Sequence, residues 1–138
     1  MLAGALGLSY RTAVTLDPGR SGQASLVVGP GDTALALGSG DVDVLATPRL
    51  ISLCEEATVR AVGDLLGPGR TSVGVRVQFD HLAPVRVGSG VNAEAVLEKV
   101  EGRRLVFTVT ATDVGGLVGA GRVTRVVVEV EGFLAKAR

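Results

Sequence analysis

A chain of 138 residues is long enough to bury a sizeable hydrophobic core within one domain. Its 14 basic and 14 acidic residues cancel, and it has no Trp, one Tyr and three Phe, which argues against a nucleic-acid or anionic-membrane surface. Residues 1–8 lack the basic region of a signal peptide and no run is long enough to cross a bilayer, so we expect a cytoplasmic protein.

The first third of the chain is predicted to contain short strands separated by turns rich in glycine and proline. Residues 9–16 alternate between polar and apolar side chains and are expected to form the first strand, which Asp17-Pro18-Gly19 closes. Residues 24–28 form a short apolar strand candidate. Residues 33–37 are expected to be a further short piece of the same kind.

One long helix is predicted over residues 47–66. Thr47 is a suitable N-cap, and Pro48 suits the first helical position because its missing N–H is not needed there. Gly67-Pro68-Gly69 ends the helix. Small and apolar residues recur at three- and four-residue spacing and are expected to face the core. These residues are Leu50, Leu53, Cys54, Ala57, Ala61 and Leu65.

Glu55 is an acidic residue on a flank of this helix where an apolar residue would be expected. Glu56 and Arg60 form an i,i+4 pair on the solvated flank. Glu55 lies on the opposite flank, where its neighbours are Ile51, Thr58, Val59 and Val62. A carboxylate in such surroundings reaches water at the helix edge, is paired with a partner, or is kept for acid–base or nucleophilic chemistry.

Four strand-like runs follow the helix, at residues 71–81, 90–100, 103–113 and 117–131. The connections between them are short and rich in glycine, which favours antiparallel neighbours. This order of elements predicts an α+β fold in which one long helix lies on a curled antiparallel sheet.

His81, the only histidine in the chain, ends the first of these four runs. Strand alternation places it on one face with Val73, Val75, Val77 and Phe79. If this face packs on the helix, His81 points toward the half of the helix that contains Thr47 and Glu55. A histidine on an apolar face is more often structural. However, a base oriented by a carboxylate near a hydroxyl is a recurring hydrolytic arrangement.

Cys54 falls among the core positions of the helix and is most simply a small buried hydrophobe, although a lone thiol can also be a nucleophile. Burial without a positive neighbour raises the pKa of a thiol, which disfavours catalysis by Cys54. One histidine and one cysteine give poor ligand spacing for a metal ion, so we expect no metal and no other cofactor.

Several short motifs between residues 9 and 133 occur in an order and spacing that are typical of one protein family. They are Leu45-Ala46-Thr47-Pro48 with Glu55 eight residues beyond Thr47, Thr71-Ser72-Val73-Gly74, His81-Leu82-Ala83-Pro84, Val100-Glu101-Gly102-Arg103-Arg104-Leu105 and Gly119-Ala120-Gly121-Arg122-Val123-Thr124-Arg125. With these motifs the chain resembles the hotdog-fold thioesterases, and within them the fluoroacetyl-CoA thioesterase-like group.

The resemblance implies one hotdog domain over residues 1–138, in which a curved antiparallel sheet wraps one long central helix. It also implies a homodimer whose sheets join edge to edge, with acyl-CoA bound at the subunit interface and coenzyme A present only as part of the substrate. Hydrolysis of a small or medium acyl-CoA to free acid and CoA would then depend on Thr47, Glu55 and His81. Substrate binding would involve Gly74, Pro48 and Arg125, although Arg125 has an equally simple interpretation as an ion-pairing residue.

The chain departs from the group at two places. Residues 38–44 contain no aromatic side chain where the fluoroacetyl-specific member has a phenylalanine lid, and Val123 stands where the pattern usually has a histidine. The first departure argues against fluoroacetyl selectivity and leaves thioester hydrolysis in place. Two other functions on the same fold remain open, namely a non-catalytic module that binds acyl-CoA or an acyl carrier protein, and an acyl-thioester hydratase.

Overall fold

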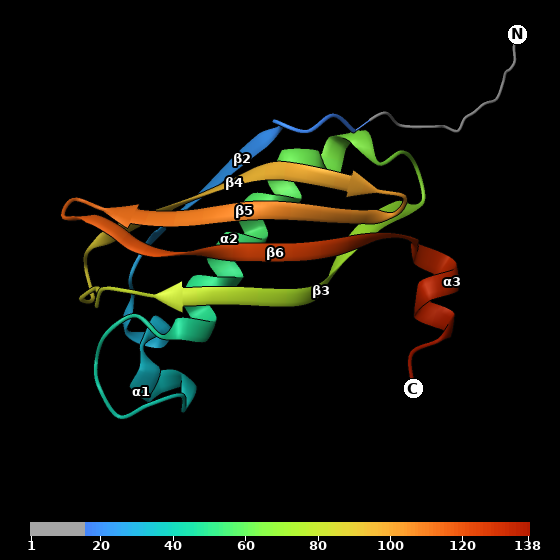
Figure 1. The fold of residues 1–138 in the computed structure, drawn as a ribbon. Coiled ribbons are helices and arrows are strands. Elements are labelled where there is room, and N and C mark those ends of the chain that lie inside the picture. Colours follow the sequence, from blue (N-terminus) through green and yellow to red (C-terminus); the bar gives the residue numbers. More distant parts are fainter. Residues whose placement is uncertain (1–15) are drawn as a thin grey trace, which may run out of the picture.

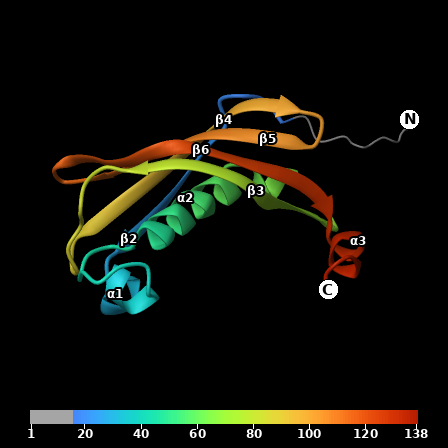
Figure 2. The ribbon, with the colours of Figure 1, turned by 60° about the horizontal axis from the view of Figure 1, so that its bottom comes forward.

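The computed structural model describes residues 16–138, in which one antiparallel sheet curls around one long helix (Figures 1 and 2). The sheet has the order β2-β4-β5-β6-β3. Its strands are β2 (Ser21–Val27), β3 (Arg70–His81), β4 (Gly90–Glu101), β5 (Arg104–Asp113) and β6 (Gly116–Glu129). The long helix, α2 (Thr47–Val62), lies against the concave face of the sheet (Figure 2). The predicted α+β architecture is therefore confirmed.

Helix α2 is held by a face of small and apolar side chains. Leu50, Leu53, Cys54, Ala57 and Ala61 are all fully buried between the helix and the sheet. A 3₁₀ turn, Gly63–Leu65, follows the helix, so the predicted helix over 47–66 ends four residues early. The tighter turn leaves Leu65 only partly buried, and Leu66 occupies the core instead. Within residues 16–138, none of the helices is both long and apolar enough to cross a bilayer.

The strand predictions after the helix agree with the structure to within two residues at each end. The last of them, 117–131, runs two residues too far because Val130 begins a short helix, α3 (Val130–Ala135). The predicted strand over 24–28 corresponds to β2, which begins three residues earlier. The predicted strand over 9–16 lies outside the described residues, except for Leu16, which is not in a strand.

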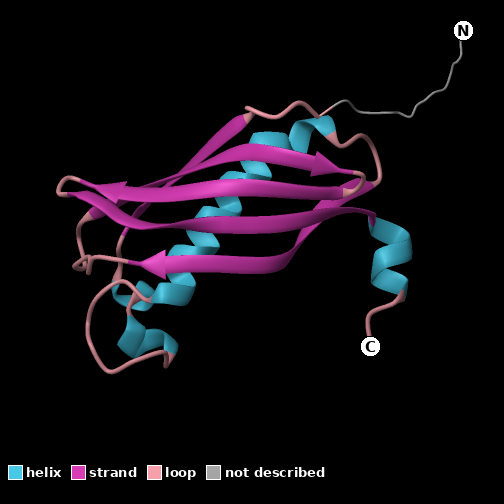
Figure 3. Ribbon diagram, in the orientation of Figure 1, coloured by secondary structure: helices cyan, strands magenta, loops and turns pink. Residues whose placement is uncertain are grey.

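The expectation for residues 33–37 is wrong, because they form a helical turn, α1 (Ala34–Leu37). Thr33 caps this turn by accepting a hydrogen bond from the N–H of Ala36 at 3.1 Å. Gly38 ends it in the left-handed region, with φ 70°. Five residues are too few to show a helical period, so only these two caps mark the turn in the sequence. Figure 3 shows α1 beside the start of α2, and α3 at the opposite end of the sheet.

Strand β3 contains a β-bulge at Val75. Gly74 lies opposite Arg125 of β6, and the next paired residue, Arg76, lies opposite Thr124, so Val75 is the extra residue in β3. Val75 is 51% exposed. The prediction that Val75 shares an inward face with His81 is therefore wrong.

The bulge reverses the alternation in the first half of β3. Phe79 packs on the core after the bulge, as the sequence predicted. Before the bulge, Ser72 is buried and Gly74 faces α2, whereas Val73, which was predicted to face inward, lies on the other side of the strand. One inserted residue exchanges the two faces of a strand because the side-chain period is two.

Candidate active site

Thr47 and His81, both predicted site residues, meet at the start of α2. Thr47 Oγ1 lies 2.8 Å from His81 Nδ1. The contact forms because β3 runs across the sheet and ends beside the first turn of α2 (Figure 1). His81 Nε2 is buried and has no hydrogen-bond partner among residues 16–138. One ring nitrogen is therefore held by the protein and the other has no polar partner in the described chain.

The prediction that Thr47 caps the helix is wrong. Ala46 occupies the N-cap with extended backbone angles (φ −70°, ψ 140°), and no side chain accepts a capping hydrogen bond there. Thr47 is the first helical residue and Pro48 the second, where a missing N–H still breaks no intrahelical hydrogen bond. Because the Thr47 hydroxyl is not used as a cap, it can bond to His81.

Thr47 and His81 both line an open groove of about 350 Å³. The loop between α1 and α2 forms one wall, and the segment that follows β3 forms the other. The other lining residues are Ala34, Ser39, Gly40, Asp41, Val42, Val44, Leu45, Leu82, Ala83 and Pro84. The volume is at the low end of the range for small-molecule sites and suits an acyl-thioester group.

The first turn of α2 adds backbone N–H groups beside this groove. The first four N–H groups of a helix have no intrahelical partner. Ala46 donates its N–H to the carbonyl of Asp32 at 2.9 Å and Pro48 has none, which leaves those of Thr47 and Arg49. Asp32 also accepts a hydrogen bond from Arg49 Nε at 3.0 Å and so anchors the start of the helix. Sequence reasoning missed Asp32, since nothing in its surroundings marks a partner 17 residues away.

Glu55, the third predicted catalytic residue, forms a hydrogen bond with neither Thr47 nor His81. Eight residues of α-helix span about 12 Å, so Glu55 lies about two turns beyond Thr47. Its Oε2 accepts a hydrogen bond from Arg125 Nη1 at 3.2 Å, and 36% of its side chain is exposed. Of the alternatives that the sequence left open, the structure shows pairing with a cation. The remaining exposure keeps the carboxylate in reach of water.

Arg125 lies on the inward face of β6 and is buried, with 8% of its side chain exposed. Its Nε donates to Ser72 Oγ and its Nη2 donates to the Ser72 carbonyl, both at 2.8 Å. Burial lowers the pKa of the Arg125 guanidinium, and the charge and hydrogen bond of Glu55 act in the opposite direction. Arg125 therefore serves as an ion-pairing residue in this structure. Sequence reasoning missed Ser72, which the bulge at Val75 turns inward.

The other two predicted binding residues, Gly74 and Pro48, are not part of the groove. Gly74 faces α2 so closely that a Cβ at this position would overlap Glu55 Oε2. The group that makes the close approach predicted for this glycine is thus the carboxylate of Glu55. Pro48 is exposed in the first turn of α2. Neither residue lines the groove of Thr47 and His81.

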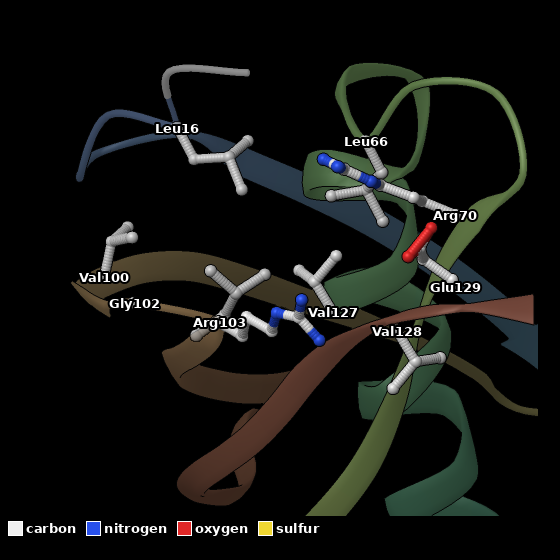
Figure 4. A pocket seen from close by; sticks show the side chains of 10 residues that line it. Leu16, Leu66, Arg70, Val100, Gly102, Arg103, Val127, Val128 and Glu129 are labelled. Atoms are coloured by element: carbon white, nitrogen blue, oxygen red, sulfur yellow. The ribbon is translucent and has the colours of Figure 1, made fainter. Parts of the chain in front are cut away.

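A second cavity, of about 150 Å³, lies at the opposite end of β3 (Figure 4). Leu66 and Val127 contribute to its apolar wall, and Arg70, Arg103 and Glu129 lie around it. It contains none of the predicted site residues, and it is too small for an acyl-CoA group. We therefore place the candidate active site in the groove at the start of α2.

Neither Cys54 nor a metal cluster provides a competing site in the described part of the chain. Cys54 is fully buried in the core, and desolvation raises the pKa of its thiol to about 11. The thiol is therefore protonated at neutral pH and a weak nucleophile. No group of three or more His, Cys, Asp or Glu side chains within residues 16–138 is placed so that it could hold a metal ion.

Solved structures show the class of protein that this fold defines. The chain is similar to the fluoroacetyl-CoA thioesterase, with a TM-score of 0.83 and 34% identity, covering 88% of this chain and 95% of that chain. The chain is also similar to a variant of that enzyme in complex with fluoroacetate and CoA, with a TM-score of 0.81 and 33% identity, covering 86% of this chain and 99% of that chain. For a thioesterase superfamily member from Thermus thermophilus, the TM-score is 0.81 and the identity 29%, and the match covers 88% of this chain and 90% of that chain. The fold is that of the hotdog thioesterase superfamily.

The family within this class is shown by the sequence comparisons. Residues 28–131 match the model of the fluoroacetyl-CoA-specific thioesterases. The fluoroacetyl-CoA thioesterase of Streptantibioticus cattleyicolor is 40% identical over 96 residues, which cover 70% of this chain and 69% of that protein. The chain belongs to the fluoroacetyl-CoA-specific thioesterase family. The resemblance and the predicted enzyme class, a thioester hydrolase, are thereby confirmed.

Proposed function

We propose that the chain hydrolyses the thioester bond of a small or medium acyl-CoA and releases a free acid and CoA. The observation that carries this proposal is the 2.8 Å contact of Thr47 Oγ1 with His81 Nδ1 beside the groove at the start of α2. Membership of a thioesterase family supports the reaction class. Because residues 38–44 contain no aromatic side chain, we do not propose fluoroacetyl selectivity.

In the proposed mechanism, His81 is the general base. If its Nδ1–H donates to Thr47 Oγ1, the lone pair lies on Nε2, the nitrogen that has no partner in the described chain. Because Nε2 is buried in the single chain, the mechanism requires that substrate binding opens it to water. Nε2 then takes a proton from water as the water oxygen attacks the thioester carbonyl carbon. The C–S bond then breaks, and the same imidazolium returns the proton to the CoA thiolate. Thr47 holds the tautomer that this sequence of proton transfers needs.

The start of α2 is the proposed site of charge stabilisation. The negative charge that develops on the carbonyl oxygen is favoured near a helix N-terminus, where the backbone N–H groups of Thr47 and Arg49 have no intrahelical partner. These donors belong to the peptide backbone and are held by the helix, so they need no rearrangement during the reaction. The proposed mechanism uses no metal and no organic cofactor. The cytoplasmic location of the protein stays a prediction.

Glu55 has two possible roles in this proposal. It either polarises the reacting water or His81, or attacks the thioester itself to give an anhydride that water then opens. Within one chain its carboxylate bonds to Arg125 and to neither Thr47 nor His81, so either role requires a substrate or a second subunit to bring the groups together. Turnover in oxygen-18 water distinguishes the routes, because only the anhydride route places the label in the Glu55 carboxylate.

The test of the proposed function is a panel of acyl-CoA thioesters from acetyl to aromatic, with release of CoA followed by a free-thiol reagent. We expect turnover with small and medium aliphatic groups, and little preference for fluoroacetyl over acetyl. Binding without turnover across the whole panel would instead favour the non-catalytic module. Hydration of an enoyl-CoA, followed spectroscopically, without thiol release would favour the hydratase.

We also propose that the protein is a homodimer joined through β3. This strand ends the sheet, and within residues 16–138 it is hydrogen-bonded to β6 on one side. Val75 and Val77 are 51% and 38% exposed on it. An unpaired strand edge of this kind can pair with the same edge of a second copy about a twofold axis. Light scattering should give twice the 14.0 kDa of one chain; a monomer at millimolar protein concentration would rule this out.

A further inference from the structure

A linked set of polar side chains joins β3, β6 and α2 behind the proposed site. Arg125 of β6 lies at its centre. It donates from Nε to Ser72 Oγ, from Nη2 to the Ser72 carbonyl and from Nη1 to Glu55 Oε2. Glu55 has a part in the proposed function, and Ser72 holds the guanidinium on the side away from Glu55.

The bulge in β3 is what builds this set. Without the extra residue Val75, a strand that points His81 toward α2 would point Ser72 and Gly74 away from it. The bulge turns both toward the helix. Ser72 then meets the guanidinium of Arg125, and Gly74 leaves room for the Glu55 carboxylate, which a Cβ would displace.

The burial of Arg125 leaves little of its side chain for direct contact with the phosphates of CoA. Only 8% of its side chain is exposed, and its Nε, Nη1 and Nη2 each donate a hydrogen bond inside the protein. Arg125 therefore acts on the groups that surround it, which are Ser72 on one side and Glu55 on the other. The role that we propose for Arg125 is therefore to hold these two groups rather than to bind substrate directly.

The two oxygens of the Glu55 carboxylate have different surroundings. Oε2 accepts the hydrogen bond from Arg125, whereas Oε1 makes no hydrogen bond in the described part of the chain. The side chain is 36% exposed, so Oε1 can reach water or a ligand. Holding one oxygen fixes the rotamer of the side chain, and this fixes where the other oxygen points.

We propose that Ser72 is a positioning residue that orients the Glu55 carboxylate for hydrolysis through the guanidinium of Arg125. Ser72 supplies two acceptors, a hydroxyl and a carbonyl, which set the plane of the guanidinium; that plane directs Nη1 at Oε2. The inference rests on the proposed function, because it gives Glu55 a part in thioester hydrolysis. It does not require a choice between the two roles of Glu55.

The test is Ser72→Ala, which removes the hydroxyl and keeps the carbonyl. We expect kcat for the best acyl-CoA of the panel to fall about 10- to 100-fold, with KM unchanged, because the carboxylate is misplaced but the groove is intact. Ser72→Thr retains a hydroxyl and should restore most of the kcat. If Ser72→Ala does not fold by circular dichroism, Ser72→Cys keeps the volume with a weaker acceptor and should show the same loss of kcat.

A double mutant separates positioning from a general structural effect. In a Glu55→Gln background, Ser72→Ala should lower kcat by less than about twofold, since the group that it positions has been altered already. The matched control is Ser25→Ala, which removes a serine hydroxyl that donates to Asn92 Oδ1 at 2.9 Å on β2, and which should leave kcat unchanged.

The outcomes separate this inference from the proposed function. If the wild-type protein hydrolyses no acyl-CoA of the panel, the proposed function and this inference both fall. If the wild type is active, the inference alone is overturned by any of three results. These are a wild-type kcat in Ser72→Ala, a wild-type kcat in Glu55→Gln, or losses that multiply in the double mutant.

Discussion

His81→Ala is expected to lower kcat for acyl-CoA hydrolysis by about 100- to 10,000-fold, the range that a positioned general base contributes. His81 is the only histidine in the sequence, so no other imidazole can take its place. Its ring is partly buried and is bonded through Nδ1 to Thr47, so the free energy of unfolding should fall by only about 1 kcal/mol. Release of CoA and urea-induced unfolding measure the two quantities.

Variants of Thr47 provide the control for this prediction. Thr47→Ser keeps the hydroxyl that lies 2.8 Å from His81 Nδ1, and should retain most of the activity. Thr47→Val keeps the shape and removes the hydroxyl, so the His81 tautomer is no longer fixed and we expect kcat to fall about tenfold. If His81→Ala hydrolyses acyl-CoA as fast as the wild type, the proposed site is wrong, whatever the activity of the Thr47 variants.

The meeting of Thr47 and His81 could be predicted because it depends on local signals at two element ends. Pro48 marks the start of a helix, and alternation over the end of β3 places His81 on the face that packs on this helix. Both signals act within a few residues of the side chain concerned. The predicted position of the N-cap was wrong, because the N-cap is Ala46 and not Thr47. This shift of one residue decides whether the Thr47 hydroxyl bonds to the helix backbone or to His81.

The partner of Glu55 could not be predicted in the same way. Arg125 is 70 residues away, and the prediction from the sequence left it open whether it binds substrate or forms an ion pair. The deciding feature is the bulge at Val75, which exchanges the faces of β3 and brings Ser72 beneath Arg125. A bulge depends on the pairing of β3 with β6, so the alternation of β3 alone carries no sign of it.

Gly22→Ala is expected to cause the largest loss of stability of any change considered in this chain. Gly22 is in β2, where the strand crosses α2 so closely that a Cβ would overlap the carbonyl of Ala57 and the N–H of Ala61. These are backbone atoms in the middle of a helix, and no rotamer change can move them aside. The helix and β2 must separate, which we expect to lower the free energy of unfolding by about 3 kcal/mol, the upper part of the range for overpacked cores.

Gly90→Ala is the matched control, because Gly90 begins β4, the neighbour of β2, and a Cβ there would meet nothing within 4 Å. Its stability should change by less than about 0.5 kcal/mol, as for an ordinary surface substitution. Urea-induced unfolding at constant m-value compares the two variants. A Gly22→Ala protein as stable as Gly90→Ala would mean that α2 is not seated against β2 as the structure has it. The first turn of that helix, which places Thr47 beside His81, would then lose its support.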